Sequence, residues 1–269
     1  MADDSKRMEV ATTLRKRLQE ISSALREARQ EAPSEEPAPE GGHRVSGPLE
    51  RCVVTLRNQT EIVVTIGTSD DAQKDPTLVQ RICNIVSSSY TAVGKSKRMD
   101  AYDAMDRLEM GDDGLRANRV LHLAYKDGVL VGCASSTFSP GWTPDGCGHW
   151  GLLAVDPAHQ NCGAATALVL AAERRLATVS ELIQIEFRNV AGDPFCDRLF
   201  DWYVRLGFNC GSKRTGFVHA YKQISEERQR WGQKQRLVAI HDFYEKQLAE
   251  IETQQRQHEG YHSGVTAAA

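Results

Sequence analysis

The stretch from Leu152 to Leu176 combines a short apolar run, a proline turn and a helix that begins with small residues. The apolar run, Leu152 to Val155, has the length of a buried strand, and Pro157 ends it because proline has no N–H to donate to a sheet. The turn contains Gly163, whose missing side chain leaves the main chain accessible. N–H groups at a helix start lack intrahelical partners, and the helix dipole favours an anion there. The pattern therefore predicts a main-chain cradle for phosphate, such as a pyrophosphate.

Three known phosphate-binding patterns bear on this turn. The dinucleotide fingerprint GxGxxG is absent, because Gly163 is the only glycine in the turn. Gly94-Lys95-Ser96 matches the end of a P-loop, but Ser89 stands where the first glycine belongs and a predicted helix precedes it, which indicates a chance match. The third pattern, Gln/Arg-x-x-Gly-x-Gly/Ala, fits Gln160 to Ala165. The alternative without a ligand is an ordinary connection whose small residues only allow close helix–sheet packing.

The strand, proline turn and loop resemble motif A of the GCN5-related N-acetyltransferase (GNAT) superfamily. A second match lies downstream, where Trp202 to Phe208 (WYVRLGF) resembles the FYxxLGF segment of that family. The two matches have the family's order and separation, and the resemblance covers about residues 60–223. It implies an α/β (α+β) fold, with a mixed, mostly antiparallel sheet flanked by helices, and acetyl-CoA or a related acyl-CoA as co-substrate.

The resemblance assigns the coenzyme contacts to main-chain groups. N–H groups of Asn161 to Ala165 would hold the pyrophosphate. The motif strand would splay from its neighbour, Leu182 to Phe187, so that free backbone groups near Leu153 to Val155 pair with the pantetheine amides. One of these N–H groups would face the thioester oxygen as an oxyanion donor. The predicted coenzyme-binding residues are Leu153, Ala154, Val155, Gln160, Asn161, Cys162, Gly163, Ala164, Ala165 and Thr166.

Tyr203 occupies the tyrosine position of the second match. In the family this phenol lies near the sulfur and can protonate the departing thiolate. A thiol has a pKa of about 8.5, so the thiolate leaves tolerably without a proton, and we expect an effect near the low end of the ~10²–10⁴-fold typical of general acids. The alternative is a helix tyrosine that only packs.

Acetyl transfer also needs a base, because an amine arrives mostly protonated near pH 7. His149 is the first candidate, since its ordinary pKa is about 6.5 and strand alternation gives it the same parity as Leu153 and Val155. A histidine here resembles the arylalkylamine N-acetyltransferase branch, but Gly151 stands where that branch has a second histidine, which weakens any prediction of arylalkylamine substrates. Glu186, on the neighbouring strand, is the second candidate. A histidine that only faces solvent or caps the strand is the alternative.

A thiol nucleophile is a further alternative, because Cys162 lies inside the phosphate-binding turn. A pair of Cys162 or Cys147 with His149 or His159 would make a hydrolase. The surrounding residues match no known nucleophile context. We therefore interpret Cys162 as a small turn residue whose N–H group, not its sulfur, contacts the ligand.

The composition limits the classes of protein. A net charge of −3 gives no basic footprint for nucleic acid, and the apolar runs are too short to cross a bilayer. The seven cysteines are scattered without CxxC pairs, which predicts reduced thiols and no metal site. The acidic, polar start MADDSKRMEV has no feature of a signal peptide. We therefore expect a cytoplasmic protein that binds neither nucleic acid nor membrane.

Helical extensions flank the predicted catalytic domain. Leu14, Leu18, Ile21 and Leu25 are spaced for one helix face, which favours packing onto the domain, or a frayed arm, over a coiled coil of so few heptads. The polar C-terminal helix, Glu226 to Gln257, would pair with the N-terminal helix, join a second subunit in a homodimer, or stay solvated. The predicted segments are a helical extension at 1–30, a flexible linker at 31–48, the acetyltransferase domain at 49–223, and a helical extension at 224–269 whose tail is disordered from Gly260.

The sequence as a whole predicts an N-acetyltransferase that moves an acetyl group from acetyl-CoA to an amine by direct attack in a ternary complex. The acceptor would be a small-molecule amine or a peptide amine. Two segments would shape its pocket, and their mixed charges and aromatic residues do not select one amine. The alternative function is a CoA-binding interaction protein without turnover. The pocket residues are Tyr90, Lys95, Lys97, Arg98, Met99 and Tyr102, with Trp142 and Asp145 from the loop Ser139 to Cys147.

Overall fold

In the computed structural model, which describes residues 2–39, 41–95 and 98–265, eight strands lie side by side in chain order as one sheet. Every neighbouring pair runs antiparallel except β6 and β7, which run parallel. This confirms the predicted mixed, mostly antiparallel sheet. The strands are β1 (Arg44–Ser46), β2 (Arg51–Thr55), β3 (Glu61–Ile66), β4 (Arg119–Lys126), β5 (Val129–Thr137), β6 (Cys147–Val155), β7 (Leu182–Asn189) and β8 (Gly216–Gln223).

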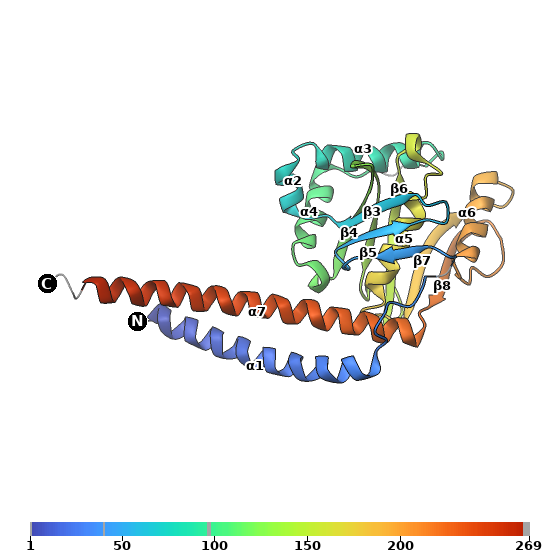
Figure 1. The fold of residues 1–269 in the computed structure, drawn as a ribbon. Helices are drawn as coiled ribbons and strands as arrows, with labels where there is room; N and C mark the ends of the chain where they lie inside the picture. The colour runs from blue at the N-terminus through green and yellow to red at the C-terminus, as the bar shows by residue number, and fades with distance from the viewer. Residues whose placement is uncertain (1, 40, 96–97, 266–269) are drawn as a thin grey trace.

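Helices cover both faces of this sheet, and two long helices extend away from it as an arm (Figure 1). The α-helices are α1 (Ala2–Glu31), α2 (Ser69–Lys74), α3 (Leu78–Thr91), α4 (Ala101–Gly111), α5 (Ala164–Leu176), α6 (Pro194–Arg205) and α7 (Glu226–Val265). Two short 3₁₀ turns, η1 (Gly114–Arg116) and η2 (Pro157–His159), precede β4 and α5. The predicted motif strand, its neighbour and the helix that follows the turn are present as β6, β7 and α5.

The two faces of the sheet bury different clusters, because side chains alternate along a strand. On β7, Ile183, Ile185 and Phe187 pack toward α5 and α6. Gln184 and Glu186 therefore lie on the opposite face, which α3 and α4 cover. The cluster under α3 and α4 includes Leu78, Ile82, Val86, Leu108, Leu121 and Leu123.

A β-bulge in β6 reverses the alternation of its side chains. The register with β5 shifts between Cys133 and Ser135, and Leu152 has a φ of 52°, in the left-handed region. Before the bulge, Trp150 packs in the cluster of α5 and α6. After it, Leu152 and Ala154 pack in the cluster of α3 and α4. The bulge thus changes which residues of the motif strand face each layer.

The strand-parity argument for His149 is wrong for this reason. A Cβ added to Gly151 would lie 2.9 Å from His149 Nε2, so these two residues share one face. Leu153 and Val155 instead pack toward α5. A strict period of two cannot reveal the extra residue of a bulge. His149 consequently lies on the α3 and α4 face, while the side chains of Leu153 and Val155 lie on the other.

β6 and β7 pair over only three residues and then diverge. The paired positions are Cys147 with Leu182, Gly148 with Ile183, and His149 with Gln184. Beyond them the two strands no longer hydrogen-bond to each other, and the bulge bends β6 at this point. The divergence that the family resemblance implies is therefore present, with free backbone edges facing one another after His149 and Gln184.

The segment predicted as a flexible linker contacts the domain. Glu36 forms an ion pair with Arg174 of α5, with an Oε2–Nε distance of 2.7 Å, and both side chains are largely buried. Arg174 also donates to the carbonyl of Gly47 at 2.8 Å. Residues 44–46 add the edge strand β1. Composition alone could not reveal these contacts, because they depend on one cation that lies far along the chain.

α1 and α7 pack side by side in an antiparallel arm (Figure 1). Arg15 forms an ion pair with Glu252 at 2.8 Å, and His241 Nε2 hydrogen-bonds to Ser22 at 3.1 Å. Of the predicted alternatives, the pairing of the terminal helices within one chain is the one observed. α7 spans Glu226–Val265, and disorder from Gly260 stays a prediction. Residues 266–269 lie outside the described part of the chain.

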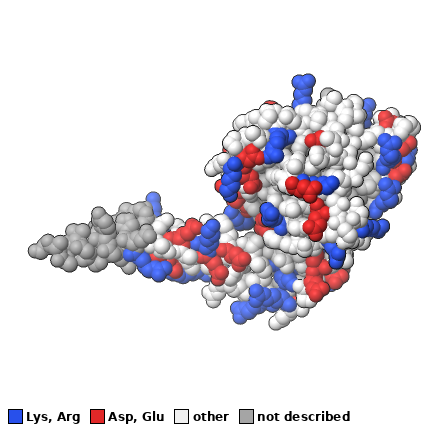
Figure 2. Space-filling view, turned by 45° about the horizontal axis from the view of Figure 1, so that its top comes forward, with Lys and Arg blue, Asp and Glu red and all other residues white. Residues whose placement is uncertain are grey.

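Charged side chains of both signs are interspersed on the face shown in Figure 2. The net charge of −3 is therefore not divided into separate acidic and basic areas on this side. Within the described residues, none of the helices combines the length and the apolar character needed to span a bilayer.

Candidate active site

The turn between β6 and α5 presents main-chain groups rather than side chains. Asp156 accepts a hydrogen bond from Ala158 N–H at 2.9 Å and so begins the 3₁₀ turn that follows the strand. Asn161 and Gly163 then adopt left-handed backbone conformations, with φ of 61° and 92°. Gly163 is the N-cap of α5, and no side chain caps the helix. The chain thus enters α5 with its first N–H groups directed outward.

These N–H groups have no protein partner. Among the described residues, the N–H groups of 161–166 donate to no protein acceptor, and the first that does so is Ala167 N–H, to the Gly163 carbonyl at 3.0 Å. Gln160 and Asn161 are exposed, and Ala165 and Thr166 are half-buried. A row of accessible donors at the positive end of a helix dipole suits a pyrophosphate.

Gly163 is held against the sheet by Leu56. A Cβ added to Gly163 would lie 1.9 Å from Leu56 Cδ1, far inside van der Waals contact. Leu56 is itself buried beside β2. The glycine is therefore required twice, by its positive φ and by the close approach of this leucine.

The free edge of β6 is partly engaged by α3. Val155 N–H donates to Ser89 Oγ at 3.4 Å, a long bond. This N–H belongs to the strand edge that diverges from β7. A stronger acceptor, such as an amide carbonyl, could replace the serine hydroxyl there.

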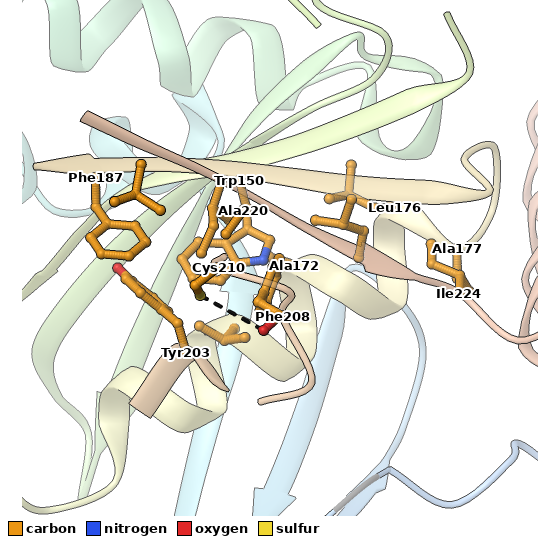
Figure 3. Close-up of a cluster of buried hydrophobic side chains, with 14 of the residues drawn as sticks. Trp150, Ala172, Leu176, Ala177, Phe187, Tyr203, Phe208, Cys210, Ala220 and Ile224 are labelled. Carbon is orange, nitrogen blue, oxygen red and sulfur yellow. Dashed lines mark hydrogen bonds between the residues drawn. The ribbon is translucent and has the colours of Figure 1, made fainter. Parts of the chain in front are cut away.

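Tyr203 lies where β6 and β7 separate. Its ring packs against Phe187 of β7, with centroids 4.6 Å apart, and against Trp150 of β6, at 5.9 Å. Figure 3 shows the phenol beside Phe187, with its hydroxyl end next to that ring. Both partners follow the last paired residues of their strands. α6 therefore places this phenol at the divergence of the two strands.

The environment of Tyr203 keeps its phenol protonated. Burial, with smaller contributions from Tyr90 and Cys210, raises the pKa of Tyr203 well above its ordinary value. Within the described residues, its hydroxyl makes no hydrogen bond to a protein group. Because no protein group accepts from this hydroxyl, it is free to donate to a bound molecule.

His149 lies on the opposite face of the sheet from Tyr203. Its Nδ1 hydrogen-bonds to Gln184 Oε1 at 3.1 Å, and Trp142 packs edge-on to its ring at a centroid distance of 5.9 Å. Burial lowers the pKa of His149, although the Gln184 hydrogen bond and Glu186 act in the opposite direction. The imidazole is therefore neutral near pH 7, as a base must be.

Glu186 is less well placed than His149. It is exposed, and its nearest basic partner is His219 of β8, whose Nδ1 lies 3.6 Å from Glu186 Oε2. It shares the face of His149 but is separated from it by Gln184. Glu186 is thus positioned to act on His149 electrostatically rather than to share its contacts.

Only some residues of the two segments that were predicted to shape the acceptor pocket are accessible as that prediction requires. Trp142 is 58% exposed beside His149, and Tyr90 is half-buried at the end of α3. Lys95 lies over the Phe195 ring of α6, at 5.8 Å from its centroid. Met99 is buried in the α3 and α4 cluster, so it cannot line an open pocket as predicted. Exposed side chains in these segments include Arg98, Tyr102 and Asp145, and Lys97 lies outside the described residues.

No Cys–His pair forms around the turn. His159 lies near Asp156, with Nδ1 4.0 Å from Oδ2, and His149 is engaged by Gln184. Within the described residues, Cys162 makes no hydrogen bond to a histidine. The geometry therefore gives no support to a thiol nucleophile.

The sequence did not predict three residues that contact this region. Ser89, Gln184 and His219 contact the site from α3, β7 and β8. Gln184 is opposite His149 only through the β6–β7 register, which the sequence does not reveal. The one available signal is that Gln184 is a polar residue inside an apolar strand, between Ile183 and Ile185.

The chain is similar to known acetyltransferases in sequence pattern and in fold. The model of the acetyltransferase (GNAT) family matches residues 79–208. The crystal structure of the GNAT domain of S. lividans PAT is 17% identical and has a TM-score of 0.51, with 66% of this chain and 99% of that chain covered. The PaiA N-acetyltransferase of Thermoplasma acidophilum, solved in complex with coenzyme A, is 12% identical with a TM-score of 0.45, covering 61% and 99%. No curated protein gives a significant sequence match.

Proposed function

Because the chain belongs to the GNAT superfamily of acetyltransferases, we propose that it transfers an acetyl group from acetyl-CoA to an amine by direct attack in a ternary complex. One observation carries the proposal. The unpartnered N–H groups before α5 lie at the end of the same strand, β6, that diverges from β7 next to Tyr203. A phosphate cradle, a free strand edge and a protonated phenol thus follow one another along a single path.

The residues divide the reaction between the two faces of the sheet. The N–H groups of 161–166 bind the pyrophosphate, and the free edge of β6 near Leu153 to Val155 pairs with the pantetheine amides. The amine approaches from the α3 and α4 face, where His149 Nε2 removes its proton. The neutral nitrogen attacks the acetyl carbonyl carbon; as the C–S bond breaks, the nitrogen loses its second proton to solvent and becomes the amide. Tyr203 gives its proton to the departing sulfur and regains one from solvent.

The acceptor is proposed to be a small-molecule amine or a peptide amine. Aromatic and basic side chains around His149, such as Trp142 and Arg119, fit either class. A mixture of amines and peptides incubated with acetyl-CoA and the protein, followed by mass spectrometry, tests this directly. An acetylated product identifies the acceptor class, and a complete lack of acetylated product across a broad panel argues against turnover.

The alternative is a CoA-binding interaction protein without turnover, for which the projecting arm of α1 and α7 is the favouring observation. Release of free thiol from acetyl-CoA separates the two. Thiol release that depends on an amine supports the transferase. Tight CoA binding without thiol release supports the interaction protein, and thiol release without an amine indicates a hydrolase.

Dimerisation through the terminal helices stays a prediction. Leu14 and Leu25 of α1 are buried within one chain, so a dimer would have to use the remaining faces of the arm. Met8 and Val10 are exposed near its end. Light scattering after size-exclusion chromatography, with a variant that lacks residues 1–30 as comparison, measures the oligomeric state.

His149→Gln is expected to lower kcat/KM by about 10²-fold near neutral pH and to remove the acidic limb of its pH profile. Burial lowers the pKa of His149, so the wild-type limb should lie below about pH 6.5, where the imidazole becomes protonated and cannot accept a proton. Glu186→Gln should retain the acidic limb but shift it to lower pH, because the carboxylate favours the protonated ring. If both variants keep the wild-type profile, neither residue is the base.

A further inference from the structure

A line of hydrogen bonds crosses three strands on the α3 and α4 face of the sheet. His149 Nδ1 on β6 lies 3.1 Å from Gln184 Oε1 on β7, and Gln184 Nε2 lies 3.0 Å from His219 Nδ1 on β8. Gln184 is only 1% exposed. A single buried amide therefore joins two imidazoles, one of them the proposed base.

The two ends of an amide are chemically different, so this line specifies where the protons are. The carbonyl oxygen only accepts and the amide nitrogen only donates. Gln184 Oε1 can therefore bond His149 only if Nδ1 carries the proton. Gln184 Nε2 can bond His219 only if that Nδ1 is a bare acceptor. In the orientation that the structure shows, with Oε1 toward His149 and Nε2 toward His219, the amide fixes the tautomer of His149.

We infer that Gln184 is a positioning residue that keeps the proton of His149 on Nδ1 and so makes Nε2 the basic atom. The inference deepens the proposed function and rests on it. Nε2 is the ring atom that borders Gly151, where an added Cβ would lie at only 2.9 Å. The missing side chain leaves room for an amine at that atom. The orientation of the Gln184 amide, the tautomer of His149 and the space beside Gly151 therefore all identify Nε2 as the basic atom.

The same hydrogen bond supports the ring after it has taken a proton. When Nε2 accepts the proton of the amine, the ring becomes an imidazolium whose Nδ1–H still donates to Gln184 Oε1. Around the ring, Glu186 favours this charge, whereas Arg119 opposes it and Trp142 is neutral. The proton leaves again to solvent after the product departs, so the cycle adds and removes one proton at Nε2.

The direct test is the tautomer of His149, measured by NMR on protein labelled with ¹⁵N-histidine. The His149→Gln spectrum identifies the signals of His149 by their loss. The wild-type ring is expected to carry its neutral-form proton on Nδ1. In Gln184→Leu, the proton should redistribute toward Nε2 and the pKa of His149 should fall, because an acceptor is lost. A wild-type ring protonated on Nε2, or an unchanged ring in Gln184→Leu, overturns the inference.

Kinetics provide the second measurement. Gln184→Leu should lower kcat/KM about 10- to 100-fold, the range seen when partners that orient imidazoles at metal sites are removed, and should move the acidic limb to lower pH. Gln184→Glu keeps an acceptor for Nδ1, so it should retain the tautomer and move the limb to higher pH. Gln223→Leu makes the same change on β8, opposite Leu182, and should match wild type. A uniform loss in both Gln184 variants, with an unmoved limb, contradicts the positioning role.

The NMR result does not require turnover. If acetylation fails for every amine while His149 keeps its Nδ1 proton only with Gln184 present, the proposed function fails and the positioning contact stands. If acetylation succeeds and the tautomer is independent of Gln184, the function stands and the inference fails. Thermal unfolding of each Gln184 variant confirms that the compared proteins are folded.

Discussion

Gly163→Ala is expected to weaken acetyl-CoA binding about 100-fold. Gly163 has a φ of 92°, where a non-glycine residue costs on the order of 1–3 kcal/mol. The added Cβ would also lie 1.9 Å from Leu56 Cδ1. The turn must therefore move, and movement misaligns the N–H groups that are proposed to bind the pyrophosphate. Each hydrogen bond to a charged group contributes about 1.5–3 kcal/mol, so the loss of one or two gives this factor.

Calorimetric titration with acetyl-CoA and with free CoA measures this effect. Gly128→Ala is the matched control, because Gly128 has a φ of 79° in the β4–β5 turn and nothing lies within 4 Å of an added Cβ. Gly128→Ala therefore reports the effect of placing alanine at a positive φ without a steric clash. Adding Leu56→Ala to Gly163→Ala removes the clash and should recover part of the affinity. Unchanged affinity in Gly163→Ala would exclude this turn as the pyrophosphate site.

The conformation of the turn between β6 and α5 was predictable because its determinants are local. Pro157 ends the strand, Gly163 supplies the left-handed residue, and small residues follow it within one turn of helix. Each requirement is met by a residue next to the groups that it positions. The sequence pattern and the structure therefore agree at this point without any knowledge of distant contacts.

The environment of His149 was not predictable, because its determinants are distant or irregular. The bulge at Leu152 breaks the period of two on which the parity argument depended. The partner Gln184 is brought opposite His149 by the parallel pairing of β6 and β7. A helix, α5, and its connections separate these strands in the chain, so no local spacing could indicate the contact.

The contacts of the segment 31–48 were not predictable from the sequence for a related reason. Glu36 lies in a segment rich in proline, glutamate and glycine, which indicates flexibility by composition. It forms an ion pair with Arg174, and Lys234 donates to the carbonyl of Pro33 in the same segment. Composition averages over a segment and cannot show which distant cations contact it.

Tyr203→Phe is expected to lower kcat about 10- to 100-fold while leaving the affinity for acetyl-CoA almost unchanged. Burial raises the pKa of Tyr203, so its phenol is fully protonated throughout the neutral range and can donate to the leaving sulfur. Loss of a general acid usually costs about 10²–10⁴-fold, and a thiolate leaving group needs the least help. The effect should therefore lie near the low end of that range or just below it.

Stability separates this role from mere packing. Within the described residues, the Tyr203 hydroxyl bonds to no protein group, so its removal breaks no hydrogen bond and should change the free energy of unfolding by no more than about 0.5 kcal/mol. The ring contacts with Phe187 and Trp150 are kept by phenylalanine.

Tyr244→Phe, in the arm, is the matched control and should leave kcat at the wild-type value. A Tyr203→Phe enzyme that is as stable as wild type and turns over at the same rate would remove this phenol from the reaction. The departing sulfur would then leave as the thiolate, which its low pKa permits. Catalysis would in that case depend on the main chain of β6 and on the base on the opposite face.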